Sequence, residues 1–391
     1  MKVSTRLPDP SPEEVAISRA LVARISSELD AGFLPFDRFM ELALYAPGLG
    51  YYVAGAQKFG PAGDFVTAPE LSPLFGACVA RQCAETLRAT AGGIIEFGGG
   101  SGRLAVSVLR ALAAQGLPAV NYAIVELSPE LRARQYAHIE ATAPEVLAQV
   151  QWWQGPPRAT WTGVILANEI LDALPVTRFE IASGGVLECG IGLDAAGQLE
   201  ARTRPAGATL SSEVIAALAH PTQAYGTGYR SEINFAQRAW LADLPNFLRR
   251  GVVILADYGY PRAEYYHPDR TDGTLQCYYR HRVHADPLWW PGVQDMTAAV
   301  DFTAVANAAV AAGFEVAGFA EQAQYLLATG ITELLAQVGE HAPAALHRAT
   351  QAVKTLLLPE AMGTRVKFMT LARNYTGPIV GYTLRDARHR L

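Results

Sequence analysis

The stretch GGIIEFGGGSGRLAVSVLRALAAQG, residues 92–116, contains the signal that decides the fold. It opens with a short apolar run, continues with four glycines within residues 98–102, and ends in a segment whose apolar residues recur at helical spacing. A strand, a glycine-rich turn and a helix in this order are typical of nucleotide-binding α/β proteins. Glycines let a ligand approach the backbone, and the N-terminus of the helix carries partial positive charge. The stretch therefore predicts an α/β domain with a ligand site at the glycine loop.

The same rhythm continues along the chain. The segments NYAIVEL, QVQWWQG, TGVILANEIL and GVVILADYGY are short apolar runs separated by helix-like segments. Strands that are apolar along almost their whole length are typical of a parallel sheet covered by helices on both faces. The late stretch TRVKFMTLARN predicts one more strand, beside GFEVAGFAE.

Other segments do not fit a minimal α/β unit. Residues 12–45 predict two helices, the first with Ser11 as its N-cap. Residues 175–206 alternate like antiparallel strands, and residues 322–358 look like inserted helices. We therefore expect residues 1–76 to form an N-terminal helical extension with a cofactor-covering loop. Residues 77–391 would form the main domain, with insertions near 175–250, 260–300 and 322–358.

Composition excludes several classes of function. The chain has 391 residues, half of them hydrophobic, and a net charge of −5 without any basic stripe, so we expect no nucleic-acid partner. Its four cysteines form no CxxC pair or Cys/His cluster, which argues for a reduced protein without a metal site. The N-terminus does not resemble a signal peptide, and no apolar run is long enough for a membrane span, so we expect a cytoplasmic protein. The oligomeric state stays open.

Two ligand classes compete for the glycine loop. A dinucleotide fingerprint, GxGxxG, that begins at Gly98 would need a third glycine where Arg103 stands. Glu96, which precedes the loop, would repel a pyrophosphate but would attract the positively charged ammonium and sulfonium groups of S-adenosylmethionine (SAM). The pattern E-x-G-x-G-x-G, from Glu96 through Gly98 and Gly100 to Gly102, therefore favours SAM over NAD.

A second carboxylate supports this interpretation. Glu126 ends the next predicted strand, 30 positions after Glu96 (126 − 96). A carboxylate at such a strand end can accept hydrogen bonds from both hydroxyls of a ribose.

Longer blocks resemble the MidA-like family of class I SAM-dependent methyltransferases, which includes the mitochondrial complex I assembly-factor arginine methyltransferase. The blocks cover most of the chain and include GDFVTAPELSPLFG (63–76), EFGGGSGRL (96–104), VELSPELRARQ (125–135), ANEILDALPV (167–176), YRSEIN (229–234), DYGY (257–260), GTLQCYYRH (273–281), PGVQDMTAAVDF (291–302), QAQYLLATGI (322–331) and MGTRVKFMTLAR (362–373). One position departs from the family pattern: Ala299 stands where the family usually has His before VDF.

The resemblance implies a Rossmann-like fold with a mostly parallel seven-stranded sheet, and methyl transfer from SAM to a protein side chain, with an arginine guanidinium favoured. Two alternatives remain: a non-catalytic assembly factor that keeps the SAM fold, and an NAD-linked oxidoreductase, which the missing fingerprint disfavours. In GDFVTAPE, we expect Asp64, Phe65 and Thr67 to close over the cofactor, although this segment could instead cap the next helix.

The acceptor side should lie at the carboxyl ends of the fourth and fifth strands, where open α/β sheets bind ligands. Asn168, Glu169 and Asp172 follow the fourth strand, and Glu169 is the preferred carboxylate for holding a guanidinium by two hydrogen bonds. Asp172 could instead cap a following helix. Tyr258 would shape the acceptor pocket after Asp257, which we interpret as structural. The resemblance adds His281 as a candidate base, because it stands in a family block, although a lone histidine is more often structural.

Overall fold

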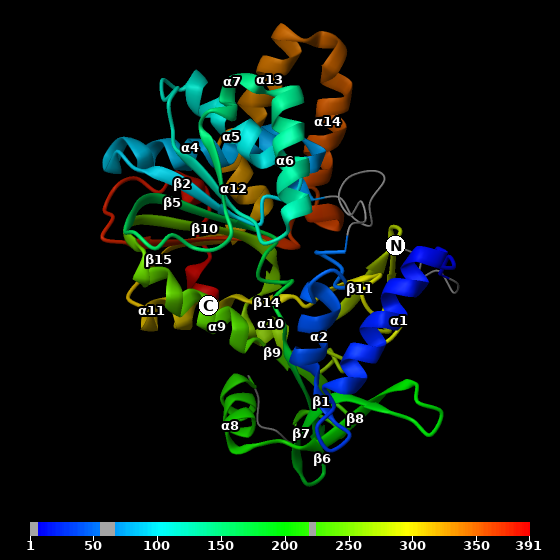
Figure 1. Cartoon of the computed structure of the whole chain (residues 1–391). Helices are drawn as coiled ribbons and strands as arrows, with labels where there is room; N and C mark the ends of the chain where they lie inside the picture. Colours follow the sequence, from blue (N-terminus) through cyan, green and yellow to red (C-terminus); the bar gives the residue numbers. More distant parts are fainter. Residues whose placement is uncertain (1–6, 55–66, 219–223) are drawn as a thin grey trace. The chain divides into compact units, whose positions relative to one another are not determined.

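The computed structural model describes residues 7–54, 67–218 and 224–391, which form two compact units (Figure 1). Unit 1 combines the N-terminal segment with Asp172–Ala239 and Tyr260–Ala304, and unit 2 combines Val66–Leu171, Trp240–Gly259 and Val305–Leu391. This division differs from the expected one, which ended the N-terminal part at residue 76 and treated the two long inserts as parts of the main domain. The reason is that the N-terminal segment and the inserts share one sheet and one apolar core.

The sheet of unit 2 confirms the expected fold class. Seven of the eight strands of this sheet run in the order β4-β3-β2-β5-β10-β16-β15; the pairs from β4 to β10 are parallel, and β16 pairs antiparallel with both β10 and β15. The strands are β2 (Gly93–Phe97), β3 (Tyr122–Val125), β4 (Val150–Trp153), β5 (Trp161–Asn168), β10 (Leu248–Tyr260), β15 (Glu315–Glu321) and β16 (Val366–Arg373). The expected pairing of the last two strands is present, with Phe319 opposite Met369.

The strand register brings the ends of the parallel strands to one edge. Phe97 at the end of β2 pairs with Val125 of β3 on one side and with Ala167 of β5 on the other. Asn168 of β5 in turn pairs with Ala256 of β10. The glycine loop and the polar residues that follow β3, β5 and β10 therefore emerge at the same edge of the sheet, which is where such sheets bind ligands.

Helices bury both faces of this sheet. Successive residues Ile94 and Ile95, whose side chains point to opposite faces, are both completely buried. Cys78 and Cys83 lie in the same core on α4, and all four cysteines are free thiols, as expected. The helices that lie in unit 2 are α3 (Ala68–Leu71), α4 (Pro73–Thr90), α5 (Arg103–Ala114), α6 (Pro129–Thr142), α7 (Pro144–Leu147), α12 (Gln322–Ala328), α13 (Ile331–His341) and α14 (Pro343–Leu357).

Unit 1 is built around an antiparallel sheet. Strand β7 pairs with β6, β8 and the short β1, and β9 pairs with β6, which confirms the antiparallel strands expected within residues 175–206. The elements are α1 (Pro12–Ser27), β1 (Leu34–Pro35), α2 (Phe36–Tyr45), β6 (Thr177–Ala182), β7 (Gly185–Leu193), β8 (Leu199–Pro205), α8 (Ala208–Ala217), β9 (Arg230–Ile233), α10 (Arg262–Tyr265), β11 (Gln276–Tyr279), β12 (Arg282–His284) and β13 (Asp295–Thr297). Two further helices, α9 (Phe235–Asp243) and α11 (Phe302–Ala311), run across the unit boundaries.

The N-terminal helices agree with the sequence. Ser11 caps α1: its hydroxyl accepts from the Glu14 amide at 3.3 Å, and the Glu14 carboxylate accepts from the Ser11 amide at 2.6 Å. This reciprocal pair is a capping box, which satisfies two amides that the helix leaves open. In the part of the chain that the structure describes, no helix is both long and apolar enough to cross a bilayer.

Candidate functional site

The glycine loop after β2 has backbone conformations that residues with a side chain rarely adopt. Gly98, Gly100 and Gly102 have φ values of 67°, 52° and 84°, in the left-handed region that favours glycine. These are the three glycines of the E-x-G-x-G-x-G pattern. A Cβ on Gly98 would lie 2.2 Å from the Ile170 side chain, whereas a Cβ on Gly100 would meet nothing within 4 Å. The loop is therefore packed on one side and open at Gly100, as backbone that receives a ligand must be.

The loop continues into the N-terminus of α5, where Gly102 is the N-cap and no side chain caps the first amides. Free amides and the partial positive charge at this end suit the carboxylate of a bound amino acid. On one flank, Glu70 of α3 accepts a hydrogen bond from the Ser101 hydroxyl and forms an ion pair with Arg103 at 3.1 Å. These contacts hold the start of α5 in place.

Glu96 is buried within β2, and its carboxylate accepts a hydrogen bond of 2.8 Å from the Tyr122 hydroxyl of the neighbouring β3. Burial raises the pKa of the Glu96 carboxyl to about 8. The hydrogen bond from Tyr122 opposes this rise, and the Glu126 charge adds to it. Because burial disfavours the ionised form of this carboxyl, a nearby cation would stabilise the carboxylate. The role of Glu96 in holding the amino-acid end of SAM stays a prediction that this geometry allows.

Glu126 stands directly after β3, at the same edge of the sheet. Its carboxylate accepts from the Ser128 amide at 3.0 Å and from the Gln135 side-chain amide at 3.2 Å. Burial raises its pKa, and these hydrogen bonds oppose the rise. A carboxylate has about four acceptor positions, so these donors leave room for a ribose hydroxyl. The ribose role also stays a prediction.

Sequence reasoning missed two neighbours of Glu126. Gln135 of α6 lies completely buried between Glu126 and the glycine loop, and no motif of its own announced it. Leu127, the next residue in the chain, is 66% exposed, but a single exposed leucine is ordinary on a protein surface and needs no functional explanation. The only available signal was that both residues stand in the block VELSPELRARQ.

The residues after β5 form the second part of the site. Glu169 has φ of 52°, a strained conformation for a residue with a long side chain, and strain of this kind is concentrated at functional sites. The Asn168 side-chain amide donates to the Glu169 carboxylate at 3.4 Å. Both side chains are half-buried at the sheet edge, as is Tyr258 near the end of β10. The structure thus brings Asn168, Glu169 and Tyr258 to the same edge as the glycine loop.

Asp257 fixes the Glu169 turn. Its Oδ2 accepts from the amides of Ile170 at 3.1 Å and Leu171 at 2.8 Å, and its Oδ1 accepts from the Tyr258 amide at 2.8 Å. The side chain is completely enclosed. The interpretation of Asp257 as structural is confirmed, and the structure adds what it supports: the backbone that carries Glu169.

Asp172 and His281 belong to unit 1. The alternative that Asp172 caps a following helix is wrong, because a turn follows it and the chain then enters β6 at Thr177. Its carbonyl accepts from the Ala298 amide at 2.9 Å. His281 lies exposed in the two-residue turn between β11 and β12, where it and Arg280 have φ of 60° and 47°. Left-handed values at both positions are the signature of a tight hairpin turn, which gives His281 a structural explanation. The catalytic roles of both residues stay predictions.

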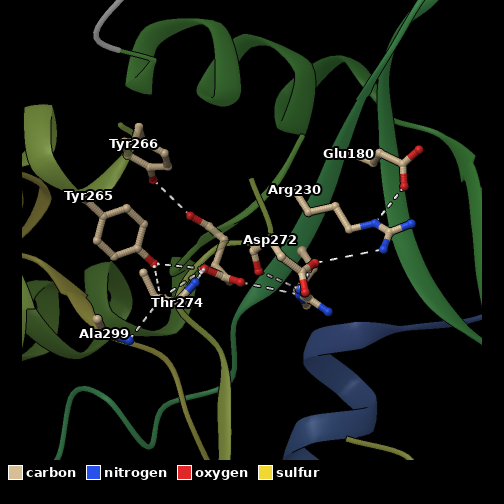
Figure 2. Close-up of polar contacts among 9 residues, drawn as sticks. Glu180, Arg230, Tyr265, Tyr266, Asp272, Thr274 and Ala299 are labelled. Carbon is tan, nitrogen blue, oxygen red and sulfur yellow. Dashed lines mark hydrogen bonds and ion pairs between the residues drawn. The ribbon is translucent and has the colours of Figure 1, made fainter. Parts of the chain in front are cut away.

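Of the cofactor-covering segment, Asp64 and Phe65 lie outside the described residues. Thr67 precedes α3 as its N-cap, and its side chain makes no capping hydrogen bond, so it is not occupied in the alternative role of a cap. Ala299, at the position where the family pattern has His, donates its amide to the Thr274 hydroxyl at 3.1 Å in a polar cluster of unit 1 (Figure 2). No group of three or more metal-ligating side chains is found among the described residues.

The comparisons with known proteins agree with this geometry. Residues 78–320 match the model of a family described as S-adenosyl-L-methionine-dependent methyltransferases. A Burkholderia thailandensis protein crystallised with S-adenosyl-homocysteine is 41% identical, covers 99% of this chain and 100% of its own, and superposes with a TM-score of 0.93.

Among curated proteins, the mitochondrial protein arginine methyltransferase NDUFAF7 homolog of Drosophila melanogaster is 28% identical over 94% of this chain and 89% of its own. The human protein of that name is 26% identical over 90% and 82%. The NAD-linked alternative has no support among these relatives. The chain therefore belongs to the MidA-like family of class I methyltransferases, enzymes that use S-adenosyl-L-methionine as methyl donor.

Proposed function

We propose that this methyltransferase acts on the guanidinium group of an arginine side chain in a protein. The observation that carries the proposal is Glu169, a half-buried carboxylate on a strained turn at the edge where the glycine loop also emerges. A carboxylate can bind a guanidinium by two parallel hydrogen bonds, a geometry that an amine or hydroxyl acceptor would not need. The names of the curated relatives, protein arginine methyltransferases, support the same substrate class.

Different residues would bind SAM and the arginine acceptor, so that the methyl group and the attacking nitrogen lie in line. SAM supplies an electrophilic methyl group when it is bound. The loop backbone at Gly98, Gly100 and Gly102 would receive its amino-acid end, and Glu126 would hold its ribose hydroxyls. Displacement at a methyl group requires the attacking atom to be close and aligned, so positioning supplies much of the rate.

Glu169 would prepare the acceptor. A guanidinium is a poor nucleophile because its pKa lies above about 12 and its charge is delocalised. A carboxylate that accepts two of its N–H groups would draw positive charge onto those nitrogens and leave the third nitrogen richer in electrons. Asn168, which donates to Glu169, would keep the carboxylate oriented.

The experiment is methylation of a cell lysate with tritiated SAM, followed by mass spectrometry of the labelled protein. We expect label on arginine with the unaltered enzyme and a large loss with Glu169→Gln, while calorimetry shows unchanged affinity of the variant for S-adenosyl-homocysteine. Label on another residue type would overturn the arginine assignment. Equal labelling by Glu169→Gln would overturn the role of Glu169.

A protein substrate is thus proposed on the strength of the relatives. The cytoplasmic location stays a prediction, since the curated relatives are named as mitochondrial.

A further inference from the structure

The Gln135 side chain is hydrogen-bonded to three parts of the structure around the site, although no sequence motif points to it. It lies on α6 and is completely buried. Its side-chain nitrogen donates to the Gly100 carbonyl at 3.1 Å and to the Glu126 carboxylate at 3.2 Å. Its side-chain oxygen accepts from the indole N–H of Trp152, on β4, at 2.8 Å. One amide group thus joins the glycine loop, the end of β3 and the edge strand of the sheet.

The chemistry of the partners fixes which way this amide points. An indole N–H can only donate, so the amide oxygen must face Trp152. A carbonyl and a carboxylate can only accept, so the NH₂ group must face Gly100 and Glu126. Both N–H groups are then used, and no other orientation of the amide satisfies all three partners. Gln135 is therefore locked in one orientation by groups of opposite hydrogen-bonding character.

The two groups that Gln135 holds would contact two different parts of one ligand, the amino-acid end and the ribose of SAM. Gly100 is the open position of the glycine loop, where an added Cβ would meet no atom within 4 Å. Glu126 is the carboxylate assigned to the ribose. α6 also packs directly on the loop, because a Cβ on Gly102 would lie 3.6 Å from the Gln135 Cα. The spacing between the loop and the carboxylate therefore depends on Gln135.

We propose that Gln135 is a positioning residue that sets the distance between the glycine loop and Glu126, and so matches the site to the spacing between the amino-acid end and the ribose of SAM. This inference rests on the proposed ribose role of Glu126. Trp152 acts through Gln135, because its indole N–H holds the Gln135 amide in the orientation that donates to Gly100 and Glu126. Neither residue needs to touch the reacting atoms.

The test compares two buried glutamines of unit 2. In Gln135→Met both N–H donors are lost at nearly constant volume. Gln82→Met is the matched control: Gln82 is also completely buried, but it donates to the Pro378 carbonyl and accepts from the Val380 amide, so its bonds are made with the C-terminal segment and not with the loop. We expect both variants to melt at a lower temperature, because both leave buried backbone groups unpaired.

Only Gln135→Met should weaken S-adenosyl-homocysteine, by roughly ten- to a hundredfold in calorimetry, the range for an unpaired buried polar group. The KM for SAM should rise similarly, with kcat at saturating SAM nearly unchanged. Trp152→Phe should show a smaller effect of the same kind. Equal affinity losses in Gln135→Met and Gln82→Met would overturn the proposal, since a purely structural role predicts that result.

Two further variants distinguish a failure of this inference from a failure of the proposed ribose role of Glu126, on which it rests. Unchanged affinity in Glu126→Ala would overturn the ribose role itself, whereas weakened binding in Glu126→Ala with normal binding in Gln135→Met would overturn only the positioning role. Should Gln135→Met fail to fold, Gln135→Glu keeps the shape but places an acceptor against Glu126, and normal S-adenosyl-homocysteine affinity in that variant would equally contradict the proposal.

Discussion

Backbone conformation at single residues shapes the cofactor loop. Gly98, Gly100 and Gly102 occupy the left-handed region, but they differ in what surrounds them: Gly98 is packed against Ile170, and Gly100 faces open space. A side chain at Gly100 would therefore enter the space predicted for the ligand without meeting other protein atoms within 4 Å of its Cβ. This makes Gly100 the residue at which binding can be altered most directly.

We expect Gly100→Val to abolish binding of S-adenosyl-homocysteine. The left-handed backbone would add a stability loss of about 1–2 kcal/mol for any residue with a Cβ. Gly116→Val is the control, because Gly116 also has positive φ, 82°, and open space around it, but lies beyond the far end of α5. Calorimetry should show binding by the control and none by Gly100→Val. Retained affinity in Gly100→Val would exclude the loop as the ligand site.

The predicted role of Glu96 in SAM binding implies that the affinity for SAM depends on pH. Burial raises the pKa of its carboxyl from 4.5 to about 8, so near neutral pH the group is mostly protonated. An ionised Glu96 attracts a cation and a neutral one does not. We expect the affinity for SAM to increase between about pH 6.5 and pH 9 as the group ionises, and Glu96→Gln to remove this increase. A calorimetric pH series on both proteins checks this, and identical slopes would contradict it.

The same pKa predicts how stability changes. Because the carboxyl binds its proton more tightly in the folded chain than in the unfolded one, the folded state is favoured most below pH 4.5, and this advantage is lost as the pH rises toward 8. Glu96→Gln should therefore be less sensitive than the unaltered protein to a rise in pH over this range. Melting temperatures measured across the range give the comparison.

At the scale of elements, a side chain of β10 fixes the turn that follows β5. Asp257 at the end of β10 accepts from three backbone amides, and two of these follow Glu169 in the turn after β5. Because parallel strands end at one edge, a single carboxylate on one strand can hold the turn after its neighbour. The strained φ of Glu169 persists because this contact fixes the backbone on its far side.

We expect Asp257→Asn to reduce methyl transfer by about 10- to 100-fold, the effect of a misplaced catalytic group. Asparagine has one acceptor oxygen where the site needs two, so one set of amides must face an NH₂ group. S-adenosyl-homocysteine affinity should change little, because Gly100 and Glu126 follow other strands, β2 and β3. A selective loss of kcat in steady-state assays with calorimetry as control would support this. A parallel loss of cofactor affinity would instead indicate general damage to the sheet.

At the scale of the whole molecule, unit 1 is assembled from three separate stretches of chain. Buried Glu232 of β9 links two of them, Asp172–Ala239 and Tyr260–Ala304: its carboxylate accepts from the Thr274 amide at 2.9 Å and hydroxyl at 3.0 Å, and it forms an ion pair of 3.4 Å with Arg178. Figure 2 shows Thr274, Tyr265 and Ala299 gathered in this cluster. A Cβ on Gly273 would lie 2.3 Å from the carboxylate, so glycine is required there.

We expect Glu232→Ala to destabilise the protein by about 3 kcal/mol, because Thr274 loses a buried acceptor and Arg178 keeps only its ion pair of 3.5 Å with the exposed Asp272. Glu200→Ala is the control in the same unit: its ion pair with Arg202 is 42% exposed on both sides, and such pairs contribute at most about 1 kcal/mol. Denaturant unfolding measures both. A similar small change in the two variants would show that the cluster does not hold unit 1 together.

The sequence by itself determined much of the fold and part of the site. Short apolar runs separated by helical segments predicted the parallel sheet, and the alternating glycines after Glu96 predicted the glycine loop, because strand, turn and cap preferences act over a few neighbouring residues. The same local patterns led to Glu126, Glu169 and the N-cap Ser11. Local signals of this kind are present in the chain before it folds.

Only the tertiary structure decided what depends on distant partners. Gln135 gave no local signal, since its importance comes from Gly100, Glu126 and Trp152 meeting around it. The sequence allows Asp172 to cap a helix, and only the structure excludes this, because the chain turns after Asp172 and enters β6 at Thr177. The grouping of the N-terminal segment with two later stretches was equally invisible, because shared strands and a shared apolar core depend on which surfaces meet, and a linear sequence does not state that.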